Sequence, residues 1–203
     1  MRWLKLCTTG SERPDMTYRY GFKREANSIA RQARKELGLT PLDALDPFAL
    51  AGSLGIPVTP LSELHKDAAE AVHFFQQIDP DTFSALTVFA GTRRCIVHND
   101  YHSLGRQVSN LAHELAHALL LHDPSPPLDD RGCRLWNQDI EDEAEFLGGA
   151  LLITEEAALW IVRSEMSLSE AGSRFQVSEK MVKYRLNVTA ARRRVKRMNS
   201  KVN

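Results

Sequence analysis

The sequence predicts an α+β fold in which a small β-sheet packs against several helices. Segments with helical spacing of apolar residues flank four short runs of strand-like composition. We expect one helix from Phe22 to Leu37, ended by Gly38, and a second from the Asp46-Pro47 cap to Leu54. The four strand-like runs, separated by turn residues, are Val58–Pro60, Ala71–Gln76, Ser84–Ala90 and Cys95–Asn99.

A long helix is predicted after Ser103, which is a suitable N-cap. No glycine or proline occurs from Arg106 to His122, and Asp123-Pro124 then ends the helix. Apolar residues recur along it at helical spacing, so we expect much of it to be buried. They are Leu104, Val108, Leu111, Ala112, Leu115, Ala116, Leu119 and Leu120.

One turn of this helix carries the pattern H-E-x-x-H, as His113-Glu114-Leu115-Ala116-His117. Residues four apart on a helix face the same way, so the two imidazoles can bind one cation. Glu114 points about 100° away from His113, where it can reach a water molecule beside the ion without binding the ion itself. Two histidines and a carboxylate on a buried turn are costly without a cation, which favours a zinc site over two core histidines.

A catalytic zinc usually has three protein ligands and one water. His122 is a poor third candidate because it lies about 140° around the helix from His117, and we expect it to interact with the helix dipole instead. A second helix with an acidic start, from Ile140 to Leu152, offers better ones. Glu143 is the first choice because it shares a stripe with the apolar residues of that helix, and Glu141 is the second.

Three segments resemble the ImmA/IrrE family of metallo-endopeptidases. The run Arg106–His117 is similar to the family pattern R-q-x-x-x-x-A-H-E-L-G-H, and Glu143–Thr154 is similar to E-A-N-x-F-A-A-x-L-L-M-P. Ala44–Val58 resembles the opening helix and strand of the family, and the match extends from about Phe22 to Leu186. The resemblance implies a zincin-like domain with its third zinc ligand at Glu143. It also implies a protein substrate, namely a helix-turn-helix transcriptional repressor.

The expected chemistry follows from these groups. Zn²⁺ held by His113, His117 and Glu143 would lower the pKa of its water toward ~7, and Glu114 would act as the general base. Candidates for stabilising the oxyanion are Tyr101, His102 and Arg106, each with a structural role as its alternative. The proline-rich loop that follows the helix is either a lid or a simple connection.

Three parts are predicted along the chain: a disordered leader at residues 1–15, the zincin-like metallopeptidase domain at 16–165, and a helix-turn-helix-like segment with a basic tail at 166–203. Charge is segregated: residues 112–170 carry thirteen acids and three Lys/Arg, whereas residues 174–203 carry ten Lys/Arg and one acid. The basic segment either contacts DNA or packs on the catalytic part as a pair of helices.

Three widely spaced cysteines, Cys7, Cys95 and Cys133, form no disulfide framework, which indicates a reducing compartment. No apolar run approaches the ~20 residues of a membrane span, so we expect a cytoplasmic protein without membrane contact. The leading hypothesis is a zinc endopeptidase that cuts a regulatory protein at a specific site. The alternative is a non-catalytic regulator that binds DNA or a repressor through its basic C-terminal segment, with zinc in a structural role.

Overall fold

The computed structural model describes residues 18–91, 93–122 and 137–200. The predicted leader at residues 1–15 and the proline-rich loop lie outside the described residues. The first part of the chain contains α1 (Phe22–Glu36), α2 (Pro47–Ser53), β1 (Val58–Pro60), η1 (Leu61–Leu64), α3 (His65–His73), η2 (Phe74–Ile78), β2 (Ala85–Ala90) and β3 (Arg93–His98). The second part contains α4 (Leu104–Leu119), α5 (Gln138–Leu152), α6 (Glu155–Arg163), α7 (Leu168–Phe175), α8 (Glu179–Val188) and α9 (Ala191–Asn199).

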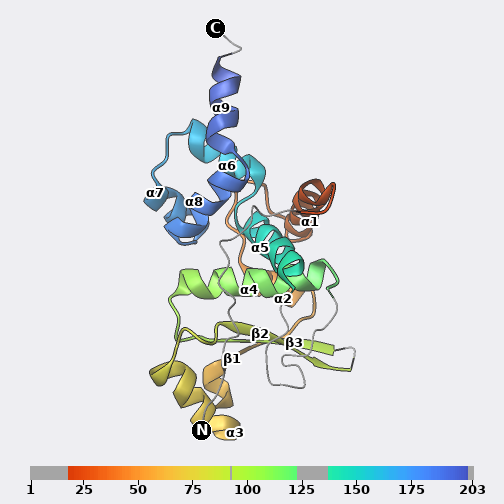
Figure 1. Cartoon of the computed structure of the whole chain (residues 1–203), viewed down its shortest axis with the longest axis vertical. Helices are drawn as coiled ribbons and strands as arrows, with labels where there is room; N and C mark the ends of the chain where they lie inside the picture. Colours follow the sequence, from red (N-terminus) through yellow and green to blue (C-terminus); the bar gives the residue numbers. More distant parts are fainter. Residues whose placement is uncertain (1–17, 92, 123–136, 201–203) are drawn as a thin grey trace.

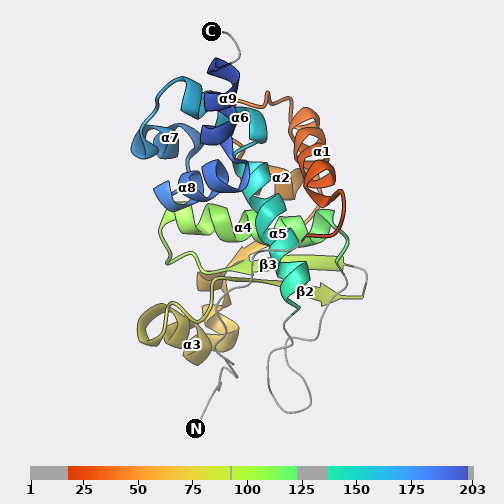
Figure 2. The same cartoon turned by 45° about the horizontal axis from the view of Figure 1, so that its top comes forward.

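The elements form layers with α4 near the middle (Figure 1). The sheet lies on one side of α4, and α5 and the C-terminal helices lie on the other, with α9 at the far end of the molecule. The turned view shows α1 alongside α5 (Figure 2). This arrangement is the predicted α+β fold of a small sheet packed on helices.

The sheet has three strands in the order β1-β3-β2. β1 pairs in parallel with β3, and β2 pairs with β3 in antiparallel orientation, with Thr87 opposite Ile96. Side chains alternate along β2: Leu86 and Val88 are exposed, whereas Thr87 is half-buried. β2 is an edge strand and lies next to α4 (Figure 1).

Three of the four expected strands are present, but the prediction of a strand at Ala71–Gln76 is wrong. These residues belong instead to the end of α3 and to η2, which is a π-helix. Only Val72 of the run is fully buried, at 1% exposure. A short apolar run fits a strand and a buried helical turn equally well, so its periodicity did not separate the two.

Several helix starts follow the capping rules, whereas Ser103, the expected N-cap of α4, makes no side-chain cap hydrogen bond. Asp46 accepts a hydrogen bond from the backbone N–H of Phe48 at the start of α2, where Pro47 is the first helical residue. Thr154 caps α6 by accepting from Ala157 N. Ser167 and Glu170 form a capping box at the start of α7.

The hydrophobic core has two parts that meet along α4 and α5. The first joins α1, α2 and β3 to one side of these helices, and the second joins α6–α9 to the other. Arg185 of α8 is fully buried and donates to the carbonyl oxygen of Ile153 at 2.8 Å. The C-terminal helices therefore pack on the same helices that carry the H-E-x-x-H turn and the acidic run. Among the described residues, no helix is long and apolar enough to cross a membrane.

Candidate metal centre

Three side chains converge between α4 and α5. The Nε2 atoms of His113 and His117 lie 3.1 Å apart, as expected for residues four apart on a helix. Oε2 of Glu141 lies 3.2 Å from His113 Nε2 and 3.8 Å from His117 Nε2. These are the residues that the structure brings together as a possible His-His-Glu metal site.

The geometry of this triad fits a metal ion. Three atoms at these separations lie on a circle of radius about 2.0 Å, so one point can lie about 2.1 Å from all three, the length of a zinc–nitrogen or zinc–oxygen bond. Two imidazole nitrogens aimed at each other repel unless a cation or a proton lies between them. The donor set, two nitrogens and one carboxylate oxygen, is that of catalytic zinc sites.

Glu141 reaches the histidines because of how α5 crosses α4. An added Cβ at Gly148 would lie 3.1 Å from His113 Cα, so the two helices touch at this glycine. Glu141 lies seven residues before Gly148, about two turns away on the same side of α5. The side of α5 that faces α4 therefore carries Glu141.

Glu143, the expected third ligand, occupies a different place. It lies about 200° around α5 from Glu141, so it cannot share the stripe that faces α4. Its carboxylate lies 2.9 Å from Arg19 Nε and 3.7 Å from His122 Nε2. The apolar residues used to place Glu143 are buried in the core around α5, and burial alone did not show which side faces the histidines.

The carboxylate of Glu141 and the imidazole of His113 each favour the charged form of the other. Burial alone would raise the pKa of the Glu141 carboxyl, but its hydrogen bond with His113 and its contact with His117 outweigh burial and hold that pKa well below its usual range. Burial lowers the pKa of His113, but Glu141 and Glu114 together raise it above its ordinary value. Glu141 is thus a carboxylate at neutral pH, the form that binds cations.

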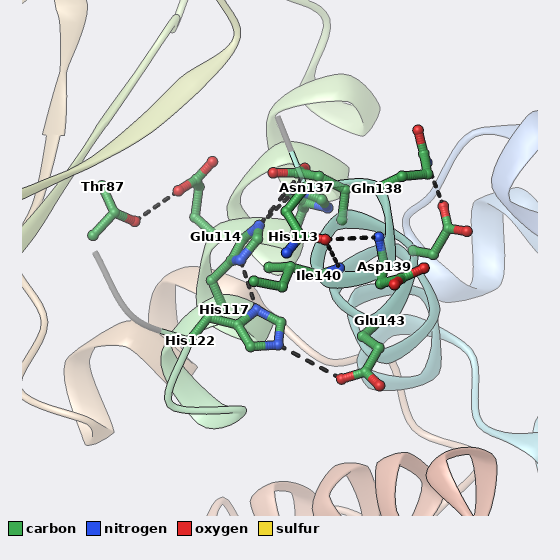
Figure 3. A network of polar contacts seen from close by, with 12 residues as sticks. Thr87, His113, Glu114, His117, His122, Asn137, Gln138, Asp139, Ile140 and Glu143 are labelled. Atoms are coloured by element: carbon green, nitrogen blue, oxygen red, sulfur yellow. Dashed lines mark hydrogen bonds and ion pairs between the residues drawn. The ribbon is translucent and has the colours of Figure 1, made fainter. Parts of the chain in front are cut away.

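Glu114 points away from the two histidines and toward β2 (Figure 3). Its Oε2 accepts a hydrogen bond of 2.6 Å from the Thr87 hydroxyl. This hydrogen bond holds one oxygen of the Glu114 carboxylate, and it joins the edge strand β2 to α4. Sequence reasoning did not identify Thr87, because its partner lies 27 residues away.

His122, expected to interact with the helix dipole, has its ring in contact with the predicted ligand His117. Its Nδ1 lies 2.9 Å from Nδ1 of His117. Burial, followed by the nearby charge of His117, lowers the pKa of His122 to about 4. The ring is therefore neutral at neutral pH, and Figure 3 shows it between His117 and Glu143.

A reversal of the backbone brings His122 back. Leu121 has φ 54°, in the left-handed region. The N–H of His122 donates to His117 O at 3.1 Å, and the N–H of Leu121 donates to Ala118 O at 3.2 Å. This pair of bonds is a Schellman C-cap, so the 140° offset of a continued helix does not apply to His122.

The three oxyanion candidates have other contacts. Tyr101 is 55% exposed, and its backbone N–H donates to the Asn99 side chain. His102 Nε2 lies 2.8 Å from the carbonyl oxygen of Pro80. Arg106 pairs with Asp81 and also donates to Ser84. The contacts of His102 and Arg106 are made by their side chains and fit a structural role, whereas that of Tyr101 is made by its backbone and does not distinguish the two roles.

The comparison with known families agrees with this site. The family model Peptidase_M78, described as the IrrE N-terminal-like domain, matches residues 51–187, which is more than half of the chain. The matched range contains the H-E-x-x-H turn and the acidic run of α5. A search of curated proteins found no match. The chain belongs to the ImmA/IrrE family of metallopeptidases, whose IrrE N-terminal-like domain it contains.

Proposed function

We propose that the protein is a zinc endopeptidase that cuts a regulatory protein, and that His113, His117 and Glu141 hold the ion. The observation that carries this proposal is the convergence of two imidazole nitrogens and one carboxylate oxygen at separations that suit one tetrahedral ion. Bound zinc would supply Lewis acidity, which polarises a peptide carbonyl and makes water more acidic.

Glu114 is the general base in this proposal. Its carboxylate takes a proton from the attacking water and later delivers that proton to the nitrogen of the leaving amine. The hydrogen bond from Thr87 keeps Glu114 in one orientation. A fixed base avoids the cost of ordering the side chain during the reaction.

The sheet offers a place for an extended substrate. β2 lies at the edge of the sheet and carries Thr87, the partner of Glu114. A peptide that adds to an edge strand gains main-chain hydrogen bonds along its length. We propose that the substrate lies along β2, with its scissile bond beside Glu114. The family resemblance makes a helix-turn-helix repressor the expected substrate.

Two variants test the role of the site. Glu114→Gln should abolish cleavage of the partner while one zinc per chain remains bound, and Glu70→Gln, an exposed carboxylate on α3, serves as the matched control. His113→Ala should lose the zinc. A purified helix-turn-helix repressor is incubated with zinc-loaded enzyme, and cuts are mapped by mass spectrometry. Cleavage by Glu114→Gln would contradict the assignment of the base, and wild-type protein without zinc would contradict the metal site.

The basic helix α9 favours a second partner, DNA. Arg192, Arg193, Lys196 and Arg197 are exposed on it, and α9 contains no acidic residue. We propose that this face contacts phosphates without reading sequence. Replacing all four with Gln should weaken duplex binding and reduce its salt dependence. Binding to duplex DNA that stays unchanged in this variant would refute the role of α9.

A further inference from the structure

We propose that His122 and Glu143 are positioning residues that hold His117 in the tautomer and orientation needed to bind the metal ion. The proposal rests on the metal site proposed above. It starts from the contact of 2.9 Å between the Nδ1 atoms of His117 and His122. Figure 3 shows the His122 ring between His117 and Glu143.

The contact determines where the protons are. Nε2 of His117 faces His113 and Glu141, so a metal bound there requires the remaining proton of His117 on Nδ1. Nδ1 of His117 must then donate, and Nδ1 of His122 must accept. A neutral His122 that accepts at Nδ1 carries its own proton on Nε2.

Glu143 favours that tautomer of His122. Its Oε2 lies 3.7 Å from His122 Nε2, and its side chain is only 14% exposed. A carboxylate at this distance attracts the N–H of Nε2 and disfavours a lone pair there. Arg19 lies 2.9 Å from the other oxygen of Glu143 and holds the carboxylate from the far side.

These contacts form one chain: Arg19 to Glu143, then to His122, then to His117. A metal-binding histidine commonly donates its other N–H to an acceptor that fixes the ring and raises its basicity. Here the acceptor is a second imidazole, itself oriented by a carboxylate. The Schellman turn at Leu121 places that imidazole beside His117.

Zinc affinity, measured by competition with a chelator on the full chain, tests the proposal. His122→Phe keeps an aromatic ring but removes the acceptor, and we expect its zinc affinity to fall about 10–100-fold. His122→Asn should retain most of the affinity, because its side-chain oxygen lies as many bonds from Cα as the Nδ1 of histidine does. Glu143→Gln should show a smaller loss than His122→Phe. His65→Phe makes the same exchange at an exposed histidine of α3 and should match the wild type.

A second measurement separates positioning from folding. In the zinc-loaded wild type, Nδ1–H of His117 should give an imidazole proton resonance that exchanges slowly with water. His122→Phe should lose this resonance or exchange it faster, and His122→Asn should keep it. Thermal unfolding of the metal-free proteins shows whether a variant is folded.

The results of these measurements either support or overturn the role of His122 and Glu143. The proposal is overturned if a folded His122→Phe binds zinc as tightly as the wild type, or if Asn and Phe lose equal affinity. A wild type that binds no zinc overturns both the metal site and this inference. A wild type that binds zinc while all variants equal it overturns the inference alone.

Discussion

Replacing Gly148 with alanine should strain the contact between α4 and α5. The new Cβ would lie 3.1 Å from the carbonyl oxygen of Ala112 and from N and Cα of His113. All three are backbone atoms of α4, so no side chain can rotate away. The helices must separate by a few tenths of an ångström, and Glu141 would move with α5.

The size of the effect follows from two opposing terms. Overpacking lowers the free energy of unfolding by about 1–3 kcal/mol, and the higher helix propensity of alanine raises it by about 1 kcal/mol. We therefore expect a net loss of about 1 kcal/mol in the free energy of unfolding, which lowers Tm by about 2–4 °C in a chain of this length. Gly52→Ala in α2 is the matched control, because an added Cβ there has no atom within 4 Å. It should raise Tm by a similar amount.

Calorimetry of the metal-free variants measures the loss of stability, and chelator competition measures the loss of zinc affinity. Gly148→Ala should unfold several degrees below Gly52→Ala and should also bind zinc more weakly than Gly52→Ala does. A Gly148→Ala protein as stable as Gly52→Ala, or more so, would refute the close approach of the two helices. Reduced stability with unchanged zinc affinity would refute the coupling of this contact to Glu141.

Three further changes test other parts of the structure. Thr87→Val removes the hydroxyl that donates to Glu114. Because a hydrogen bond to a charged group is worth about 1.5 kcal/mol, kcat should fall about tenfold while zinc stays bound. An unchanged kcat would refute the role of Thr87 in positioning the base. Burial lowers the pKa of His98 below 6.5, so the unfolded chain takes up a proton at this residue at a higher pH than the folded chain does. The contribution of neutral His98 to the free energy of unfolding is therefore complete above about pH 6.5 and is lost as the pH falls. Urea unfolding at about pH 7.5 and 5.5 should show a smaller loss for His98→Gln than for the wild type, and equal losses would contradict this. Gln176 ends α7 at φ 55°, so Gln176→Gly should raise the free energy of unfolding by about 0.5–1 kcal/mol, and a lower Tm would count against strain at that turn.

Most of the fold could be predicted because its elements carry local signals. The cap at Asp46 and the long periodic run of α4 depend on neighbouring residues, and their helices begin where predicted. The run Ala71–Gln76 lacked such signals. Its helical state depends on the surroundings of Val72, which the sequence does not show.

The candidate site was predictable to the extent that it lies on one helix. The spacing of His113 and His117 on one turn determines that their rings meet. The third member lies on α5, and the choice between Glu141 and Glu143 depends on which side of α5 faces α4. That crossing is set by the glycine at 148. His122 was misplaced because the left-handed residue before it is a leucine, which gives no local signal for a helix reversal.

The two adjacent glycines of α5 connect the metal centre with the C-terminal helices. Gly148 touches α4 at His113, whereas a Cβ added at Gly149 would lie 2.9 Å from Arg185 Cδ of α8. Since α5 touches α4 at one glycine and α8 at the next, about 100° around the helix, a displacement of α8 would be transmitted to the helix that carries Glu141. Arg185 is also fully buried, with burial lowering its pKa to about 10, and it donates to the carbonyl oxygen of Ile153 after the end of α5. The C-terminal segment is therefore part of the scaffold that positions the site, whatever it contacts on its exposed face.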